Sequence, residues 1–227
     1  MSLTVYRDLV QGSDAWLQAR CGIVTASVVG QLVTPSTLKV AANDRSRAIT
    51  ALLVSERITG RVEDSYVSAD MLRGTECEPY AIAAYEEHTG ARVDSCGLIV
   101  RTLDDGTRVG YSPDGLVGDA GLIEIKTRIP KVHVQTVVAG GVPTANVAQI
   151  QAGLWITGRA WCDYVSFSGG MHLWTMRVYP DPAWADALAE AVRVFEDAAA
   201  QMTDTYTRAV VGLPMTERIE MGDLSWT

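Results

Sequence analysis

The stretch that decides the fold is Ser112-Pro113-Asp114-Gly115-Leu116, followed after a short turn by Gly121-Leu122-Ile123-Glu124-Ile125-Lys126. Alternate side chains of a β-strand point to opposite faces, so Glu124 and Lys126 are expected to share one face. Ile123 and Ile125 are expected to pack on the other face, with Leu122 as a further candidate. The turn at residues 119–121 predicts an antiparallel strand pair, which brings Asp114 close to Glu124.

Two carboxylates at the end of a strand pair are poor material for a core, because burying unpaired charge costs free energy. They suit a divalent cation, since Mg²⁺ prefers oxygen ligands and keeps several waters; Mn²⁺ is an alternative ion. Asp114, Glu124 and the carbonyl of Ile125 would supply these oxygens. Lys126 would orient or deprotonate an attacking water, or stabilise transition-state charge. A surface hairpin carrying a Glu/Lys ladder is the competing interpretation.

Regular elements are expected on both sides of this strand pair. Apolar spacing and terminal glycines predict helices at residues 44–58, 68–89, 145–156 and 181–202, and a helix start at Thr25–Ser27. Strands are expected at residues 92–101, 107–111, 115–117, 122–127, 161–167 and 172–179. The helix at 68–89 would turn Met71, Leu72, Tyr80, Ala84 and Tyr85 toward the core. This order predicts an α/β fold with a mixed central sheet flanked by helices.

The whole chain sets wider limits. Its 227 residues, 48% of them hydrophobic, are enough for one core, so a single domain over residues 1–227 is expected. The sequence has neither a long apolar run nor a secretory signal pattern, which predicts a cytosolic protein without a membrane span. The four cysteines are far apart and are expected to be free thiols. A net charge of −8 argues mildly against nucleic acid as partner, although local basic patches can coexist with an acidic exterior.

Four blocks of the sequence, taken together, resemble the family of the phage lambda exonuclease and the YqaJ-type viral recombinases, within the PD-(D/E)xK nuclease superfamily. The blocks are residues 11–16 with Arg20 and 25–27; residues 73–78 with 89–90; residues 112–116 with 124–126; and residues 148–151 with 154–157. Their order and spacing carry the resemblance. One departure follows Lys126, where the family often has Cys-Pro and this chain has Thr127-Arg128-Ile129-Pro130.

The resemblance implies a restriction-endonuclease-like core with two metal ions in the site. Asp114 and Glu124 would bind metal, assisted by the Ile125 carbonyl, and Lys126 would serve the nucleophilic water. Glu78 would assist the second metal or the water.

The resemblance also implies contacts with DNA. Arg20 would grip a 5′-terminal phosphate, helped by Ser27 and a helix N-terminus. Gln149 and Gln151 match motif positions near the site.

The implied activity is Mg²⁺-dependent 5′-to-3′ digestion of one strand of linear duplex DNA to mononucleotides, for recombination by single-strand annealing. The resemblance implies a homotrimeric ring, a single-strand annealing partner, and a phage or prophage protein in the cytoplasm of a bacterial host. Only the inner channel of a ring must be basic; the candidates are Arg45, Arg47, Arg73, Arg128 and Lys131. Two alternatives stay open: an endonuclease of the same superfamily, and a DNA-binding recombination module that has lost catalysis.

Overall fold

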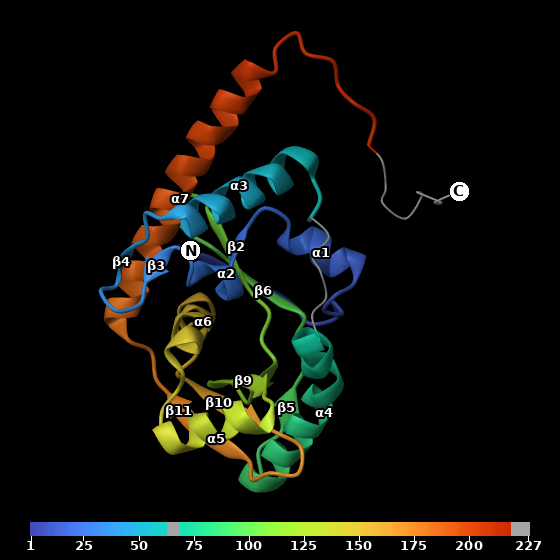
Figure 1. Ribbon diagram of the computed structural model, residues 1–227, viewed down its shortest axis with the longest axis vertical. Helices are drawn as coiled ribbons and strands as arrows, with labels where there is room; N and C mark the ends of the chain where they lie inside the picture. The colour runs from blue at the N-terminus through green and yellow to red at the C-terminus, as the bar shows by residue number, and fades with distance from the viewer. Residues whose placement is uncertain (63–68, 219–227) are drawn as a thin grey trace.

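The computed structural model describes residues 1–62 and 69–218 (Figure 1). A five-stranded sheet has the order β11-β10-β9-β8-β5. Strand β9 (Gly121–Thr127) runs parallel to β10 (Trp161–Phe167) and antiparallel to β8 (Gly115–Val117). The edge strands β5 (Val93–Asp94) and β11 (Trp174–Val178) pair antiparallel with β8 and β10. The predicted α/β class with a mixed sheet is therefore confirmed.

A second sheet has four strands in the order β1-β6-β7-β2. These are β1 (Ser2–Tyr6), β6 (Leu98–Thr102), β7 (Arg108–Tyr111) and β2 (Val24–Thr25), and a separate small hairpin joins β3 (Val33–Thr34) to β4 (Lys39–Val40). The predicted strand at residues 92–101 is wrong, because it divides into β5 and β6, which belong to different sheets. Between them the chain passes the N-terminal segment so closely that a Cβ on Gly97 would lie 2.0 Å from the carbonyl oxygen of Leu9.

Helices cover both faces of the five-stranded sheet. Helix α4 (Ala69–Thr89) packs on one face, and α6 (Thr144–Thr157) packs on the other and also reaches β6 and β7 of the second sheet. A helix between two sheets needs apolar residues on most sides, and α6 buries Ala148, Ile150, Ala152, Leu154 and Ile156. The last helix, α7 (Pro182–Ala209), packs against α6 and α3 (Asp44–Thr59), and its C-terminal end projects from the body (Figure 1).

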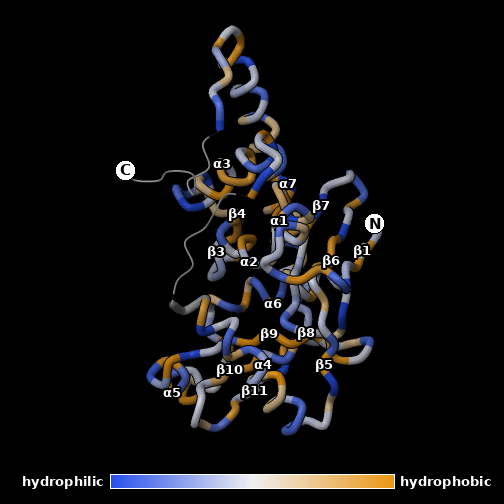
Figure 2. The backbone as a smooth tube through the Cα atoms, turned by 90° about the vertical axis from the view of Figure 1, so that its right-hand side faces the viewer, coloured by the Kyte–Doolittle hydropathy of each residue, from blue (hydrophilic) through white to orange (hydrophobic). Residues whose placement is uncertain are grey.

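The two faces of β9 follow the expected alternation, with one correction. Ile123 and Ile125 pack in a cluster with Ala81 and Tyr85 of α4. Leu122 belongs instead to the larger cluster around α6 and α7, on the face that carries Glu124, because a period of two allows no exception within a regular strand. In Figure 2 the hydrophobic colour runs along β9 and β6 in the interior.

The predicted apolar face of α4 is partly wrong. Leu72 and Tyr80 are 54% and 70% exposed, whereas Ala81 and Tyr85, one helical turn apart, are buried. Tyr80 and Ala81 are adjacent in α4. The prediction places the larger Tyr80 in the core, whereas the smaller Ala81 packs against the sheet. The predicted first residue, Ser68, and the side chain of Met71 lie outside what the structure describes.

Several described elements have no counterpart among the predictions, namely β1, α1 (Asp14–Arg20), the two-residue strands β2, β3 and β4, and α5 (Pro130–Ala139). The Ser13 side chain caps α1 by accepting a hydrogen bond from the Trp16 N–H. Helix α5 begins with Pro130 and ends at Gly140 in the left-handed conformation, both ordinary helix signals. The expected helix start near Thr25 is confirmed as α2 (Ala26–Val29), a single turn. In the described part of the chain, no helix is both long and apolar enough to span a membrane.

Candidate active site

Asp114 stands immediately before β8, at the point where β9 runs past the end of its partner. The last pair of the hairpin joins Gly115 to Ile123, so Ile125 lies beyond the β8 backbone. Its N–H donates to Asp114 Oδ2 at 2.6 Å. The N–H and C=O of one strand residue point to the same side, so the Ile125 carbonyl also faces the side of Asp114. The predicted hairpin therefore places an acidic side chain and a backbone oxygen together.

Glu124 and Lys126 share one face of β9, as predicted. Lys126 Nζ donates to Glu124 Oε1 at 2.5 Å, and the Glu124 side chain is 0% exposed. Tyr111, at the end of β7 in the other sheet, donates its hydroxyl to Glu124 Oε2 at 3.0 Å. Both oxygens of this carboxylate are thus held, one by each sheet. A fully buried carboxylate with two donors fixes its own position and that of the lysine.

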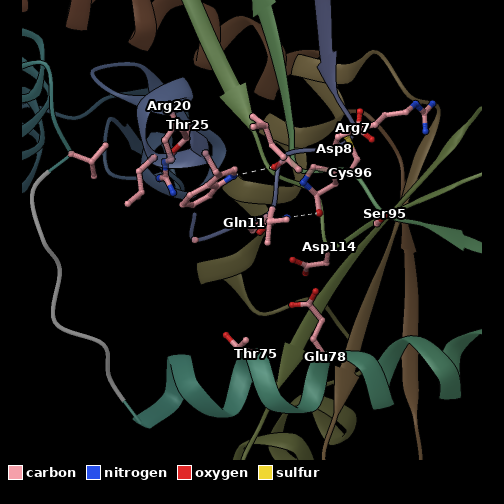
Figure 3. Close-up of a pocket in the computed structure, with 18 of the residues that line it drawn as sticks. Arg7, Asp8, Gln11, Arg20, Thr25, Thr75, Glu78, Ser95, Cys96 and Asp114 are labelled. Carbon is pink, nitrogen blue, oxygen red and sulfur yellow. Dashed lines mark hydrogen bonds between the residues drawn. The ribbon is translucent and has the colours of Figure 1, made fainter. Parts of the chain in front are cut away.

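Glu78 comes to the same place from helix α4. Glu78 and Asp114 both line a cleft of about 1400 Å³ whose other walls come from the N-terminal segment, α1, β2 and α3. In Figure 3 the Glu78 carboxylate points from α4 toward Asp114. The structure therefore brings together all four residues predicted for the catalytic cluster.

Burial is the largest electrostatic effect in this cluster, and repulsion between the carboxylates comes second. Burial raises the pKa of Asp114 well above its ordinary value, and the charge of Glu124 raises it further. Burial and then Glu124 also raise the pKa of Glu78, against the opposing effect of Lys126. Burial alone would lower the pKa of Lys126, but attraction to Glu124 and Asp114 outweighs it and the pKa is raised. The acids therefore resist ionisation, while the lysine holds its proton.

This donor set fits Mg²⁺ by its chemistry. Asp114, Glu124, Glu78 and the Ile125 carbonyl offer only oxygen, and acids that resist ionisation beside one another are what a bound cation relieves. Within the described residues, no three His, Cys, Asp or Glu side chains are close enough to hold an ion by themselves. The remaining ligands would be the backbone carbonyl, water and substrate oxygens, as is common for Mg²⁺.

A basic group lines the same cleft on its opposite side. The Arg20 guanidinium stacks on the Trp16 ring, 4.3 Å from its centroid, and Arg20 Nη2 donates to Thr25 Oγ1 at 3.4 Å. Thr25 Oγ1 in turn lies 3.0 Å from Ser27 Oγ. Burial lowers the pKa of Arg20, and the charge of Glu56 opposes that shift. The predicted pair of Arg20 and Ser27 is thus joined through Thr25, which lines the cleft with Arg20 (Figure 3).

Helix α3 holds the turn that carries Arg20. Glu56 Oε2 accepts from the Gly22 N–H at 2.7 Å, and Arg57 Nε donates to the Gly22 carbonyl at 2.7 Å. Arg57 also pairs with Glu196 of α7 at 2.7 Å. Gly22 has a φ of +67°, and a Cβ there would lie 2.5 Å from Arg57 Cγ. The turn after Arg20 therefore requires glycine on two counts.

Comparison with known proteins agrees with this geometry. A sequence model described as the YqaJ-like viral recombinase domain matches residues 15–160. The chain belongs to this family. A search of curated proteins finds no match.

Solved structures of similar proteins include exonucleases. The chain is 33% identical to an alkaline exonuclease, LHK-Exo, from Laribacter hongkongensis, over 89% of this chain and 100% of that one, with a TM-score of 0.78. A structure of LHK-Exo in complex with dAMP gives 35% identity at the same coverage and a TM-score of 0.77. A phage-related exonuclease from Haemophilus somnus 129PT, 13% identical over 81% of this chain and 96% of that one, shares the fold with a TM-score of 0.57. The chain is accordingly a recombination nuclease of the YqaJ-like family.

Two residues that match YqaJ-like motif positions lie elsewhere. Gln151 is buried on α6, where its amide donates to the Tyr179 carbonyl at 3.0 Å and accepts from the Asp181 N–H at 2.9 Å. These bonds fasten the segment between β11 and α7, and the structure does not place Gln151 in the cleft. Gln149 is half-buried on α6 and does not line the cleft.

The basic residues considered for a DNA channel are scattered. Arg45 and Arg47 are exposed on α3, and Arg47 pairs with Asp44. Lys131 is exposed on α5, whereas Arg73 and Arg128 are half-buried.

Sequence reasoning missed three residues that build the site of this YqaJ-like nuclease. Tyr111 was assigned only to a strand, and its partner Glu124 lies in a different sheet. Gln11 and Trp16 were noted only as part of a motif. Gln11 Nε2 donates to the Pro113 carbonyl at 3.0 Å, next to Asp114, and Trp16 Nε1 donates to Ser112 Oγ at 2.9 Å. No local pattern in the sequence indicates these pairings, because Gln11 and Trp16 lie 102 and 96 residues from their partners and Tyr111 bonds across two sheets.

Proposed function

We propose that the chain is a Mg²⁺-dependent 5′-to-3′ exonuclease that degrades one strand of linear double-stranded DNA to mononucleotides. One observation carries the proposal. A single cleft has the acidic residues Glu78 and Asp114 on one side, beside Glu124 and Lys126, and the arginine Arg20 on the other. An acidic, metal-binding wall serves cleavage, and a basic wall serves an anion such as a terminal phosphate. An enzyme that cuts within a duplex has no need of the second wall.

The residues divide the chemistry among them. Bound Mg²⁺, one ion or two, would supply the positive charge that makes the scissile phosphate electrophilic. Asp114, Glu124 and the Ile125 carbonyl would hold it, and Glu78 would face the second ion or the water. Lys126, which favours its charged form between two carboxylates, would orient the attacking water and stabilise negative charge on the transition state, not take the proton.

Arg20 would set the 5′-to-3′ direction of digestion in the proposed enzyme. Its guanidinium is stacked on Trp16 and bonded to Thr25, so it is ordered before any ligand arrives. A planar, ordered guanidinium binds phosphate oxygens in pairs. Anchoring a 5′-phosphate there would place the first internucleotide bond at the metal site. Release of one nucleotide at a time fits the dAMP complex of the LHK-Exo relative.

The wider setting completes the proposal. Residues 1–227 would act as one nuclease domain and assemble as a homotrimeric ring around DNA in the cytoplasm of a bacterial host. The remaining strand, with its 3′ end exposed, would pass to a single-strand annealing protein. A ring also accommodates a net charge of −8, because only its inner surface meets the phosphates.

The test compares an end-labelled, 5′-phosphorylated linear duplex with a covalently closed circle, each with Mg²⁺, with Mn²⁺ and with EDTA. We expect the linear duplex to lose its 5′ strand as mononucleotides in either metal, with the circle intact. Digestion of the circle would identify an endonuclease. The absence of cleavage, together with weak Mg²⁺ binding by calorimetry, would identify a binding module that has lost catalysis.

Two variants test the assigned roles. Lys126→Ala should reduce the rate constant by about 100-fold or more, as the loss of one preorganised donor does in other enzymes. Digestion at the wild-type rate would rule out the mechanism. Arg20→Ala should reduce the rate mainly on 5′-phosphorylated ends. An equal loss on 5′-hydroxyl ends would contradict its proposed role.

A further inference from the structure

Arg128 lies in the site region, and within the described residues its bonding is incomplete. It follows β9, and its N–H donates to the Phe167 carbonyl at 2.7 Å, which continues the pairing with β10. By the alternation of a strand, its side chain therefore lies on the face of Glu124 and Lys126. The position is where the sequence departs from the family pattern, so its role has no counterpart in the motif.

The guanidinium of Arg128 is held by neutral groups. Its Nη2 donates to Asn146 Oδ1 at 2.8 Å and lies 3.4 Å from the Tyr164 hydroxyl. Asn146 and Tyr164 are buried, at 9% and 0% exposure, so they are rigid supports. Among the described residues, no carboxylate lies within ion-pair distance of Arg128. By contrast, Arg57, Arg177 and Arg193 each form an ion pair with a carboxylate.

One donor of this guanidinium has no partner at all. Arg128 Nε is buried and makes no hydrogen bond within the described residues. Leaving a buried donor without a partner costs free energy, and the cost is larger when the group is charged. Nearby Lys126 adds repulsion, since the charge of Arg128 acts to lower the pKa of that lysine. A half-buried cation beside another cation, held by neutral groups and without a carboxylate partner among the described residues, suits an anion that the protein itself does not supply.

We propose that Arg128 binds a backbone phosphate of the DNA strand being cut, with Asn146 and Tyr164 as the positioning residues that aim its guanidinium. This inference rests on the proposed nuclease function and adds a second anion contact to it. The planar fork of arginine matches two oxygens of one phosphate, which a lysine or a water cannot do. Arg20 would hold the end of the strand, and Arg128 would hold the strand at the active-site face of β9.

The experiment compares Arg128→Gln with Lys39→Gln, which removes an exposed charge on β4, away from the site. Gln retains an amide that can donate to Asn146, so the fold is spared. We expect Arg128→Gln to reduce kcat/KM on linear duplex by about 10- to 150-fold, the range of a lost charged hydrogen bond. Binding of the same duplex in Ca²⁺, measured against salt concentration, should lose about one unit of slope. Lys39→Gln should change kcat/KM less than threefold.

A second arm locates the phosphate. Single methylphosphonates, which carry no charge, replace each of the first four internucleotide phosphates of the digested strand in turn. At one position the substitution should slow wild type but leave Arg128→Gln unaffected, because the contact is already gone. If that position is the first bond cut, the residue acts on the reacting phosphate, and if it is the next, it positions the strand. If the effects of the methylphosphonate and of Arg128→Gln are additive at both of these positions, the proposal is overturned.

The remaining outcomes are equally decisive. Equal losses in Arg128→Gln and Lys39→Gln, or an unchanged salt slope, would show that Arg128 contributes only to the overall charge. Should Arg128→Gln fail to fold, Arg128→Lys keeps the charge without the fork and should still lose rate with the slope preserved. If wild type digests no DNA, the proposed function fails, yet the salt slope of binding still decides whether Arg128 contacts phosphate.

Discussion

Replacing Glu78 by glutamine should make the metal-free protein more stable while destroying its activity. Burial and the charge of Glu124 raise the pKa of Glu78 in the folded protein above its ordinary value. A group whose folded pKa is raised binds its proton more tightly when folded, so stability falls as pH rises from the unfolded pKa through the folded one. Above that window the ionised Glu78 costs free energy, which the neutral glutamine does not.

The size of the effect follows from the exposure of the group. Relieving a repulsive surface charge commonly stabilises a protein by about 0.5–2 kcal/mol. Glu78 is half-buried at the wall of an open cleft, so solvent screens part of its repulsion and the lower half of this range applies. For a chain of this length, about 0.5–1 kcal/mol raises Tm by about 1–4 °C.

The assay is thermal unfolding in EDTA at pH 8 and again at pH 4, with Glu76→Gln as the matched control. Glu76 is exposed on the same helix, so its substitution changes the net charge equally without touching the cluster. We expect Glu78→Gln to exceed wild type at pH 8, the difference to vanish at pH 4, and Mg²⁺ to stabilise wild type more than the variant. A Glu78→Gln protein that is no more stable than Glu76→Gln at pH 8 would refute the reasoning.

Two further substitutions test the contacts that position Arg20 in the cleft. Gly22→Ala places a Cβ 2.5 Å from Arg57 Cγ at a φ of +67°, so it should cost about 1–3 kcal/mol of stability in denaturant unfolding; unchanged stability would mean that the turn adapts freely. It should also weaken the preference for 5′-phosphorylated ends, measured as a ratio of initial rates. Trp16→Phe keeps a ring under Arg20 but leaves the Gly97 carbonyl and Ser112 Oγ without the indole donor, which should lower Tm by about 2–12 °C. The end preference should survive in Trp16→Phe, and its loss would show that the indole N–H, not stacking, orders Arg20.

The sequence predicts the catalytic hairpin because everything that defines it is local. The turn at residues 119–121, the alternation on β9 and the proline before Asp114 all lie within fifteen residues. The same local logic fails at residues 92–101, which have uniform strand character. Tertiary contacts break this segment into two strands, because one half pairs with β8 and the other with β1. Between the two halves, Gly97 passes close to the Leu9 carbonyl.

Some residues of the site that are distant from the hairpin could be predicted and others could not. The resemblance to a family supplied Glu78 and Arg20, which no spacing argument connects to Asp114. Tyr111 stayed hidden because its hydroxyl crosses from one sheet to a carboxylate of another. Gln151 differs from these residues: both ends of its amide bond to backbone groups, at Tyr179 and Asp181, and its proposed contact with DNA stays a prediction.

The contacts of Trp16 connect the wall of the cleft that carries Arg20 with the wall that carries Asp114. Its ring lies under Arg20, while its Nε1 donates both to Ser112 Oγ, two residues before Asp114, and to the Gly97 carbonyl. One side chain therefore connects Arg20, the proposed anion-binding residue, to the segment before Asp114, a proposed metal ligand. An exonuclease that releases one nucleotide per cycle requires the separation between these two residues to be constant, because an error of one phosphate changes the product. The N-terminal block and the catalytic strand are distant in sequence, and this indole makes them a single structural unit.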